Sequence, residues 1–235
     1  MGGVIVRVMT NTTITLLDLT HEAKNPPAQK VKPDGTKLNI AKMDAHGKVF
    51  VRDPKTITGI GIHQTDCVFG PKADPEARHR RALGVPIHAL AFRDGVLALP
   101  YPLLWYMYHG NGMNAMSYGL EIEGSYSGVL GQSKAELLAQ RKAGNKTYDL
   151  LDELTIETAR AGVRYLYEAG LKLNSPLEFI WAHRQSRGVK ERDPGPAIWQ
   201  AVVLDYAVGV LGLKLQPERI WEDGKTIPAS WSKKP

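Results

Sequence analysis

The stretch TITGIGIH, residues Thr56–His63, decides the fold. Its apolar members Ile57, Ile60 and Ile62 are β-branched residues, which predict a strand packed in the core. The strand ends in a histidine, and residues at strand ends project from the rim of a sheet, where sites are assembled from distant parts of the chain. Two interpretations stand for His63 at this point: a structural histidine that closes a core strand, or the first ligand of a metal site.

Further strands and helices follow from the same reasoning. The alternation of Leu120 and Ile122 with glutamates predicts a strand over 117–124, and Arg93-Asp94-Gly95 is a hairpin turn between two apolar runs. Other strands are expected at 3–8, 12–19 and 177–183, and helices at 74–84, 133–144, 152–170 and 196–213. This mixture predicts an α/β fold, a single domain with a central mixed β-sheet flanked by helices.

The composition excludes several classes of protein. The chain has 235 residues, of which 43% are hydrophobic and 23% charged, as in ordinary globular proteins. No apolar run approaches the roughly 20 residues of a transmembrane helix, and the first residues lack the features of a signal peptide. The single cysteine excludes an internal disulfide framework, and the net charge of +6 favours anionic partners. The basic residues are scattered and match no nucleic-acid-binding motif, so we expect no nucleic-acid partner.

A second histidine also ends a strand, because LEFIWAH closes on His183. Ten residues later, Asp193 begins the stiff, proline-rich segment DPGPAIW. Two neutral imidazoles and one carboxylate suit zinc, and three protein ligands leave a fourth position for water. By spacing alone the structural interpretation of each histidine remains the stronger one.

Three longer motifs change that balance. GIGIHQT, YHGNGMNAMSYGLEIEG and WAHRQSRGVKERDPGPAIW occur in this order. Together they resemble the zinc-dependent N-acetylmuramoyl-L-alanine amidases of the amidase-2 type, which are related to peptidoglycan recognition proteins and phage T7 lysozyme. The resemblance predicts a zinc amidase domain at 56–213, with an insertion at about 125–150. Residues 1–55 would form N-terminal strands and a loop extension, and residues 214–235 an irregular C-terminal tail.

The resemblance implies a set of catalytic groups. His63, His183 and Asp193 would bind one zinc ion per chain, and Glu121 would be the general base. Glu123 lies on the same side of the strand by its period of two, so it remains the alternative, or a residue in contact with solvent. Many members of the family place a lysine two residues before the third ligand, as a cation for the developing oxyanion.

The sequence departs from the family at that cation. It has Glu191 where the lysine is expected, with Lys190 and Arg192 on either side. Either of these two cations would take the role, or zinc would act without one.

Substrate contacts are predicted in the YHGNG segment. His109 would touch the substrate or cap backbone groups of its loop, two interpretations of equal weight, and Asn111 and Asn114 would bind glycan or peptide. His88 is expected to be structural. Cys67, four residues after His63, is interpreted as a small, partly buried hydrophobic residue rather than a ligand.

The resemblance predicts a hydrolase that cuts the amide bond between the lactyl group of muramic acid and L-alanine in peptidoglycan. A phage-type or wall-lytic enzyme, made in the cytoplasm and released by a holin-like route, is the favoured form. A cytoplasmic amidase that recycles soluble anhydro-muropeptides is one alternative. A non-catalytic peptidoglycan-binding module is the other. In each case the partner is peptidoglycan or a muropeptide, without membrane insertion, and the oligomeric state remains open.

Overall fold

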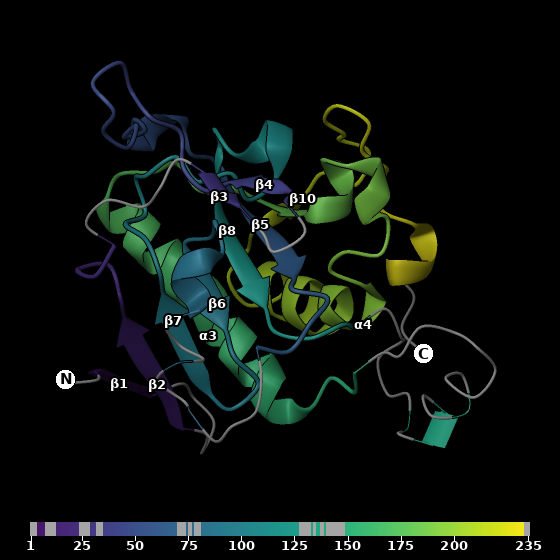
Figure 1. Ribbon diagram of the computed structural model, residues 1–235. Helices are drawn as coiled ribbons and strands as arrows, with labels where there is room; N and C mark the ends of the chain where they lie inside the picture. Colours follow the sequence, from purple (N-terminus) through teal and green to yellow (C-terminus); the bar gives the residue numbers. More distant parts are fainter. Residues whose placement is uncertain are drawn as a thin grey trace.

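A computed structural model describes residues 4–7, 13–23, 29–31, 35–69, 81–126 and 149–232, and residues 74, 77, 133, 135–136 and 139. Within these ranges, the central sheet has eight strands in the order β1-β2-β7-β6-β8-β5-β9-β10 (Figure 1). Parallel and antiparallel pairs both occur, since β5 pairs parallel with β8 and β9 while β6 pairs antiparallel with β7. The predicted α/β class with a central mixed sheet is confirmed.

The strands lie close to their predicted positions. The strands of the central sheet are β1 (Val4–Arg7), β2 (Thr13–Asp18), β5 (Gly59–Gln64), β6 (Ala89–Ala91), β7 (Val96–Leu99), β8 (Ser117–Ile122), β9 (Phe179–Ala182) and β10 (Lys214–Leu215). Glycine is required at the start of β5, because a Cβ atom on Gly59 would come within 2.4 Å of the Trp181 ring and 2.7 Å of the Phe179 carbonyl oxygen. The missing side chain lets β5 and β9 pack closely.

The two longest helical elements among the described residues contribute to the core. The helix α3 (Glu153–Lys172) begins where Asp152 accepts a hydrogen bond from the Thr155 amide and ends two residues beyond the expected stop at Gly170. The second element begins with α4 (Pro196–Ile198) and continues as a π-helical stretch, Trp199–Val208, that is largely buried as predicted. Short 3-10 helices cover Pro54–Thr56, Arg81–Gly84, Asn111–Met113, His183–Gln185, Gly188–Lys190 and Ala229–Ser232.

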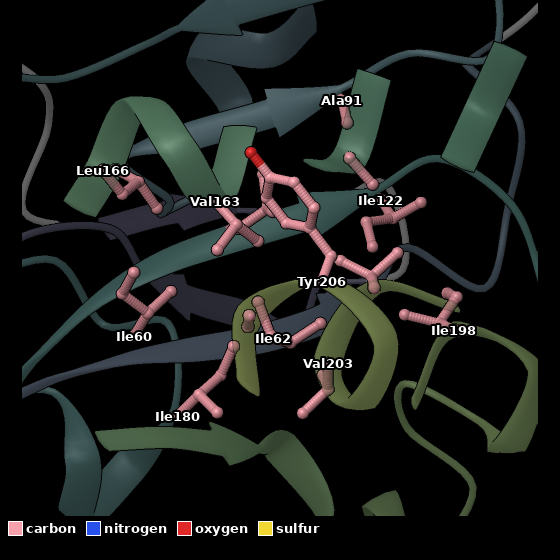
Figure 2. Close-up of a cluster of buried hydrophobic side chains, with 14 of the residues drawn as sticks. Ile60, Ile62, Ala91, Ile122, Val163, Leu166, Ile180, Ile198, Val203 and Tyr206 are labelled. Carbon is pink, nitrogen blue, oxygen red and sulfur yellow. The ribbon is translucent and has the colours of Figure 1, made fainter. Parts of the chain in front are cut away.

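The main core lies between these helices and the sheet. Figure 2 shows Ile60, Ile62 and Ile180 of the sheet gathered with Val163 of α3 and Tyr206 of the π-helical stretch. Side chains alternate along a strand, so the odd-numbered positions of β5 and β8 point away from this core. His63 and Glu121 therefore belong to the opposite face of the sheet.

The ends of the chain contribute more to the fold than their sequences indicate. Both β1 and β2 extend the central sheet, while β3 (Gln29–Val31) and β4 (Lys37–Asn39) form a separate two-stranded sheet. The segment expected as an irregular tail contains one short strand, β10, that pairs with β9, and its Trp231 side chain is buried. Two predicted segments lie mostly outside the described residues: the insertion at 125–150, with its expected helix at 133–144, and the helix expected at 74–84. In the described part of the chain, no helix has the length and apolar character needed to cross a membrane.

Candidate metal centre

The ends of three neighbouring parallel strands meet at one edge of the sheet. β5 lies between β8 and β9, with His63 opposite Glu121 and Ile62 opposite Ala182. His183 follows Ala182 directly and starts a 3-10 helix, so it lies just past the strand rather than within it. The register therefore brings two histidines and a glutamate, far apart in sequence, to the same edge.

Asp193 joins the two histidines. His63, His183 and Asp193 each offer a ligand atom, and these atoms all lie within 4.8 Å of one another. The ring centroids of His63 and His183 are 4.3 Å apart, and His183 Nδ1 lies 2.9 Å from Asp193 Oδ2. These three residues can hold a metal ion, and two imidazoles with one carboxylate fit zinc in number and kind.

The carboxylate of Asp193 is fixed from the β5 side. Its Oδ1 accepts a hydrogen bond of 2.9 Å from the backbone amide of Gln64, and its backbone oxygen accepts one from the Arg184 amide. The Gln64 side chain donates to the Arg192 backbone oxygen at 3.2 Å. The loop that carries Asp193 is thus attached directly to the strand end that carries His63.

His63 is fully buried, and its two ring nitrogens differ. Nε2 lies 3.1 Å from Nδ1 of His109, whereas Nδ1 is buried without a hydrogen-bond partner. Burial above all, and then the neighbouring His183, lowers the pKa of His63 well below its ordinary value of 6.5. A neutral imidazole with an unpartnered buried nitrogen beside a carboxylate is suited to binding a metal ion.

The two glutamates of β8 have different surroundings. Glu121 is half-buried, and burial, followed by the charge of Asp193, raises its pKa from 4.5 to about 8, while Lys190 opposes the rise. Glu123 is fully buried and accepts hydrogen bonds from the amides of Phe69 and Arg93. Glu123 therefore anchors two loops, and Glu121 is the glutamate available for proton transfer.

Lys190 and Arg192 also differ in position. Lys190 Nζ lies 3.7 Å from Asp193 Oδ2, with 40% of its side chain exposed. Arg192 lines a separate cavity of about 280 Å³ with Arg184, Glu191, Pro196 and Trp231, which includes no residue of the ligand set. Lys190 is the cation that lies beside the candidate metal ligands.

Glu191, which replaces the expected lysine, is directed toward the C-terminal segment. Its carboxylate lies 2.7 Å from Lys225 Nζ. Arg184 donates to the backbone oxygens of Glu191 and Thr226, and its guanidinium lies 4.9 Å from the centroid of the Trp231 ring. Sequence reasoning missed this contact between the tail and the loop that carries Asp193, because isolated lysines and tryptophans do not indicate a docked segment.

The YHGNG segment contributes interior groups rather than an open surface. His109 and Asn114 have only 6% and 2% of their surface exposed, and Asn114 Oδ1 accepts a hydrogen bond from the Gly110 amide. Asn111 adopts a positive φ of 50° and its amide contacts Glu222 at 3.3 Å. Their predicted role as substrate contacts stays a prediction, and the geometry supports it least for His109 and Asn114.

The remaining candidates lie outside the ligand set. His88 is buried, with contacts to Arg52, the Trp105 carbonyl and the Gly119 amide, as expected of a structural histidine. Cys67 is exposed, so its interpretation as partly buried is wrong, because the chain turns outward after β5.

Comparison with known proteins gives a likeness of overall fold. Neither a protein-family model nor a curated protein matches the sequence. Among solved structures, the chain is similar to the endolysin N-acetylmuramoyl-L-alanine amidase LysCS from Clostridium intestinale, with 17% identity over 70% of this chain and 90% of that chain and a TM-score of 0.44. It is also similar to the Ph2119 endolysin of a Thermus scotoductus bacteriophage, with 14% identity over 80% of this chain and 97% of that chain and a TM-score of 0.44. It is similar as well to Drosophila PGRP-LB, with 12% identity over 85% of this chain and 95% of that chain and a TM-score of 0.45. Likenesses at these identities and scores say nothing of the activity of this chain.

Proposed function

We propose that this protein is a zinc-dependent N-acetylmuramoyl-L-alanine amidase of the wall-lytic kind, acting on peptidoglycan. The observation that carries the proposal is the meeting of His63, His183 and Asp193 beside Glu121, whose pKa is raised to about 8. The three sequence motifs provide the substrate class, since they resemble that family in order and in residue type. Bound zinc would polarise the scissile carbonyl and activate a water molecule.

Glu121 moves the proton in this proposal. A general base works best when its pKa lies near the working pH, and burial brings this carboxyl into that range. A cation bound nearby would favour the ionised carboxylate and so lower this pKa. Glu121 would therefore accept a proton from the attacking water and return it to the departing amine of L-alanine.

Lys190 supplies positive charge at the same edge. Its ammonium group lies 3.7 Å from Asp193 Oδ2 and is partly exposed, so it is free to turn toward a bound substrate. A cation there would stabilise the negative charge that develops on the carbonyl oxygen. Glu191 does not oppose it, because the Glu191 carboxylate is paired with Lys225.

The test combines metal content with product analysis. Purified protein is stripped with a chelator, reconstituted with zinc, dialysed and assayed for release of N-terminal alanine from peptidoglycan. Wild type should hold one zinc per chain and release alanine, Asp193→Ala should lose both, and the exposed Asp205→Ala should retain both as a control. Zinc binding without alanine release would support the non-catalytic binding module. A wild-type protein that neither binds zinc nor releases alanine would refute the metal centre itself.

Activity on intact sacculi, compared with activity on soluble anhydro-muropeptides, distinguishes the wall-lytic form from the recycling form.

A further inference from the structure

His109 has its two ring nitrogens in different environments. Its Nε2 lies 3.3 Å from the Ser117 carbonyl oxygen and 3.4 Å from the Ser117 hydroxyl. That hydroxyl donates its own proton to the Met113 carbonyl oxygen at 2.7 Å. Both neighbours of Nε2 are therefore acceptors, which requires His109 to carry its proton on Nε2.

A neutral His109 then has a bare Nδ1. His109 is buried, and its ring nitrogens face a carbonyl oxygen, a hydroxyl and another imidazole rather than a carboxylate, so the ring is held neutral with a single proton. With that proton on Nε2, Nδ1 is an acceptor, and the atom that faces it at 3.1 Å is Nε2 of His63. His63 must accordingly donate from Nε2.

We propose that His109 is a positioning residue that fixes the tautomer of His63, so that the bare nitrogen Nδ1 of His63 faces the ligand set. The inference rests on the proposed metal centre. It explains why His63 Nδ1 is buried without a partner, since that lone pair is the one left for a metal ion. A histidine ligand commonly donates its second ring N–H to a carboxylate or a carbonyl, and here a second histidine accepts it.

The fold leaves space for this arrangement. A Cβ atom on Gly119 would lie 2.7 Å from His109 Nδ1, so the glycine in β8 makes room for the His109 ring. A Cβ atom on Gly110 would lie 3.3 Å from His63 Cε1 and 2.5 Å from Met113 Cε, so this second glycine admits the His63 ring and the Met113 side chain that packs there. The two imidazole rings meet edge to face, with centroids 5.2 Å apart. The strand and the loop thus hold both rings by shape as well as by the hydrogen bond.

The test measures zinc affinity and the tautomer separately. His109→Leu removes the acceptor and should weaken zinc binding by about 10- to 100-fold in a chelator competition assay. His109→Asn places an amide oxygen near the position of Nδ1 and should restore most of that affinity. His88→Leu serves as a matched control, because His88 is equally buried, lies 5.5 Å from His109 between ring centroids, and is outside the ligand set. It should lower stability without a comparable loss of zinc affinity.

A second measurement needs no variant. Nitrogen-15 spectra of metal-free wild type should show His63 protonated on Nε2 and bare on Nδ1, with His109 also protonated on Nε2. His63 protonated on Nδ1, or equal zinc affinity in wild type and His109→Leu, would overturn the inference. Failure of wild type to bind zinc would instead overturn the proposed function, whatever the spectra show.

Discussion

Replacing Glu121 with glutamine should stabilise the metal-free protein at neutral and alkaline pH, although it should abolish most of the activity. The folded protein raises the pKa of this carboxyl from 4.5 to about 8, chiefly by burial and then through the charge of Asp193. The folded state therefore binds the Glu121 proton more tightly than the unfolded state does. The contribution of this group to stability is fully present below pH 4.5 and is lost as the pH rises through about 8.

The size of the effect follows from the pKa shift. Each pKa unit corresponds to about 1.4 kcal/mol, so the interval from 4.5 to about 8 sets an upper bound of about 5 kcal/mol. Because Glu121 is half-buried, solvent screens part of this penalty, and we expect about 2 to 4 kcal/mol. Glutamine has nearly the same shape and no charge, so Glu121→Gln should avoid the loss.

Urea denaturation in chelator at pH 5, 6, 7, 8 and 9 measures this difference. The free energy of unfolding of Glu121→Gln minus that of wild type should rise from pH 5 to about pH 8 and then level off, because the carboxyl is ionised in both the folded and the unfolded wild type above that pH. The control is Glu168→Gln, a glutamate on the exposed side of α3, which separates the effect of the site from that of any such substitution. A difference for Glu121→Gln that does not change with pH would refute the raised pKa, and with it the choice of Glu121 as the base.

Other consequences can be measured independently. Lys190→Ala should lower kcat by about 10- to 1,000-fold while the protein retains zinc, whereas Arg192→Ala should leave kcat within a few-fold of the wild-type value. A larger loss of kcat in Arg192→Ala than in Lys190→Ala would assign the cation to Arg192. Arg184→Ala should destabilise the folded protein by about 2 to 4 kcal/mol, because it removes the donor to the Glu191 and Thr226 carbonyl oxygens. A denaturation midpoint equal to that of wild type would contradict this expectation. Free zinc at about 1,000 times its Kd should stabilise wild type by about 4 kcal/mol in thermal unfolding, and Asp193→Ala should lose this gain.

Much of the fold could be predicted from local patterns. The β-branched run ending at His63, the alternation around Leu120 and the apolar stretch before His183 each predicted a strand that the structure contains. Such patterns work because burial on one face imposes a period of two on the sequence. The docking of the C-terminal tail was not predictable, since Trp231 and Lys225 find their partners only in the folded chain.

The candidate site was predicted in part. The residue types at His63, His183 and Asp193, read with the motifs around them, were enough to predict a metal-binding set. The choice between Glu121 and Glu123 rested on a motif in the sequence, whereas the structure gives a physical reason, the two amides that Glu123 binds. Similarly, only the structure separates Lys190, beside Asp193, from Arg192 in its own cavity.

The sequence by itself determined which groups of this protein can do chemistry and at which strand ends they stand, because residue identity and hydrophobic period are local properties. The tertiary structure alone decided which of those groups meet. The parallel register of β5 between β8 and β9 places His63 opposite Glu121 and just across from His183. It also placed His109, for which a substrate contact and a loop cap were equal expectations, as a buried neighbour of His63, since burial and hydrogen bonding across the sheet depend on contacts between residues distant in sequence.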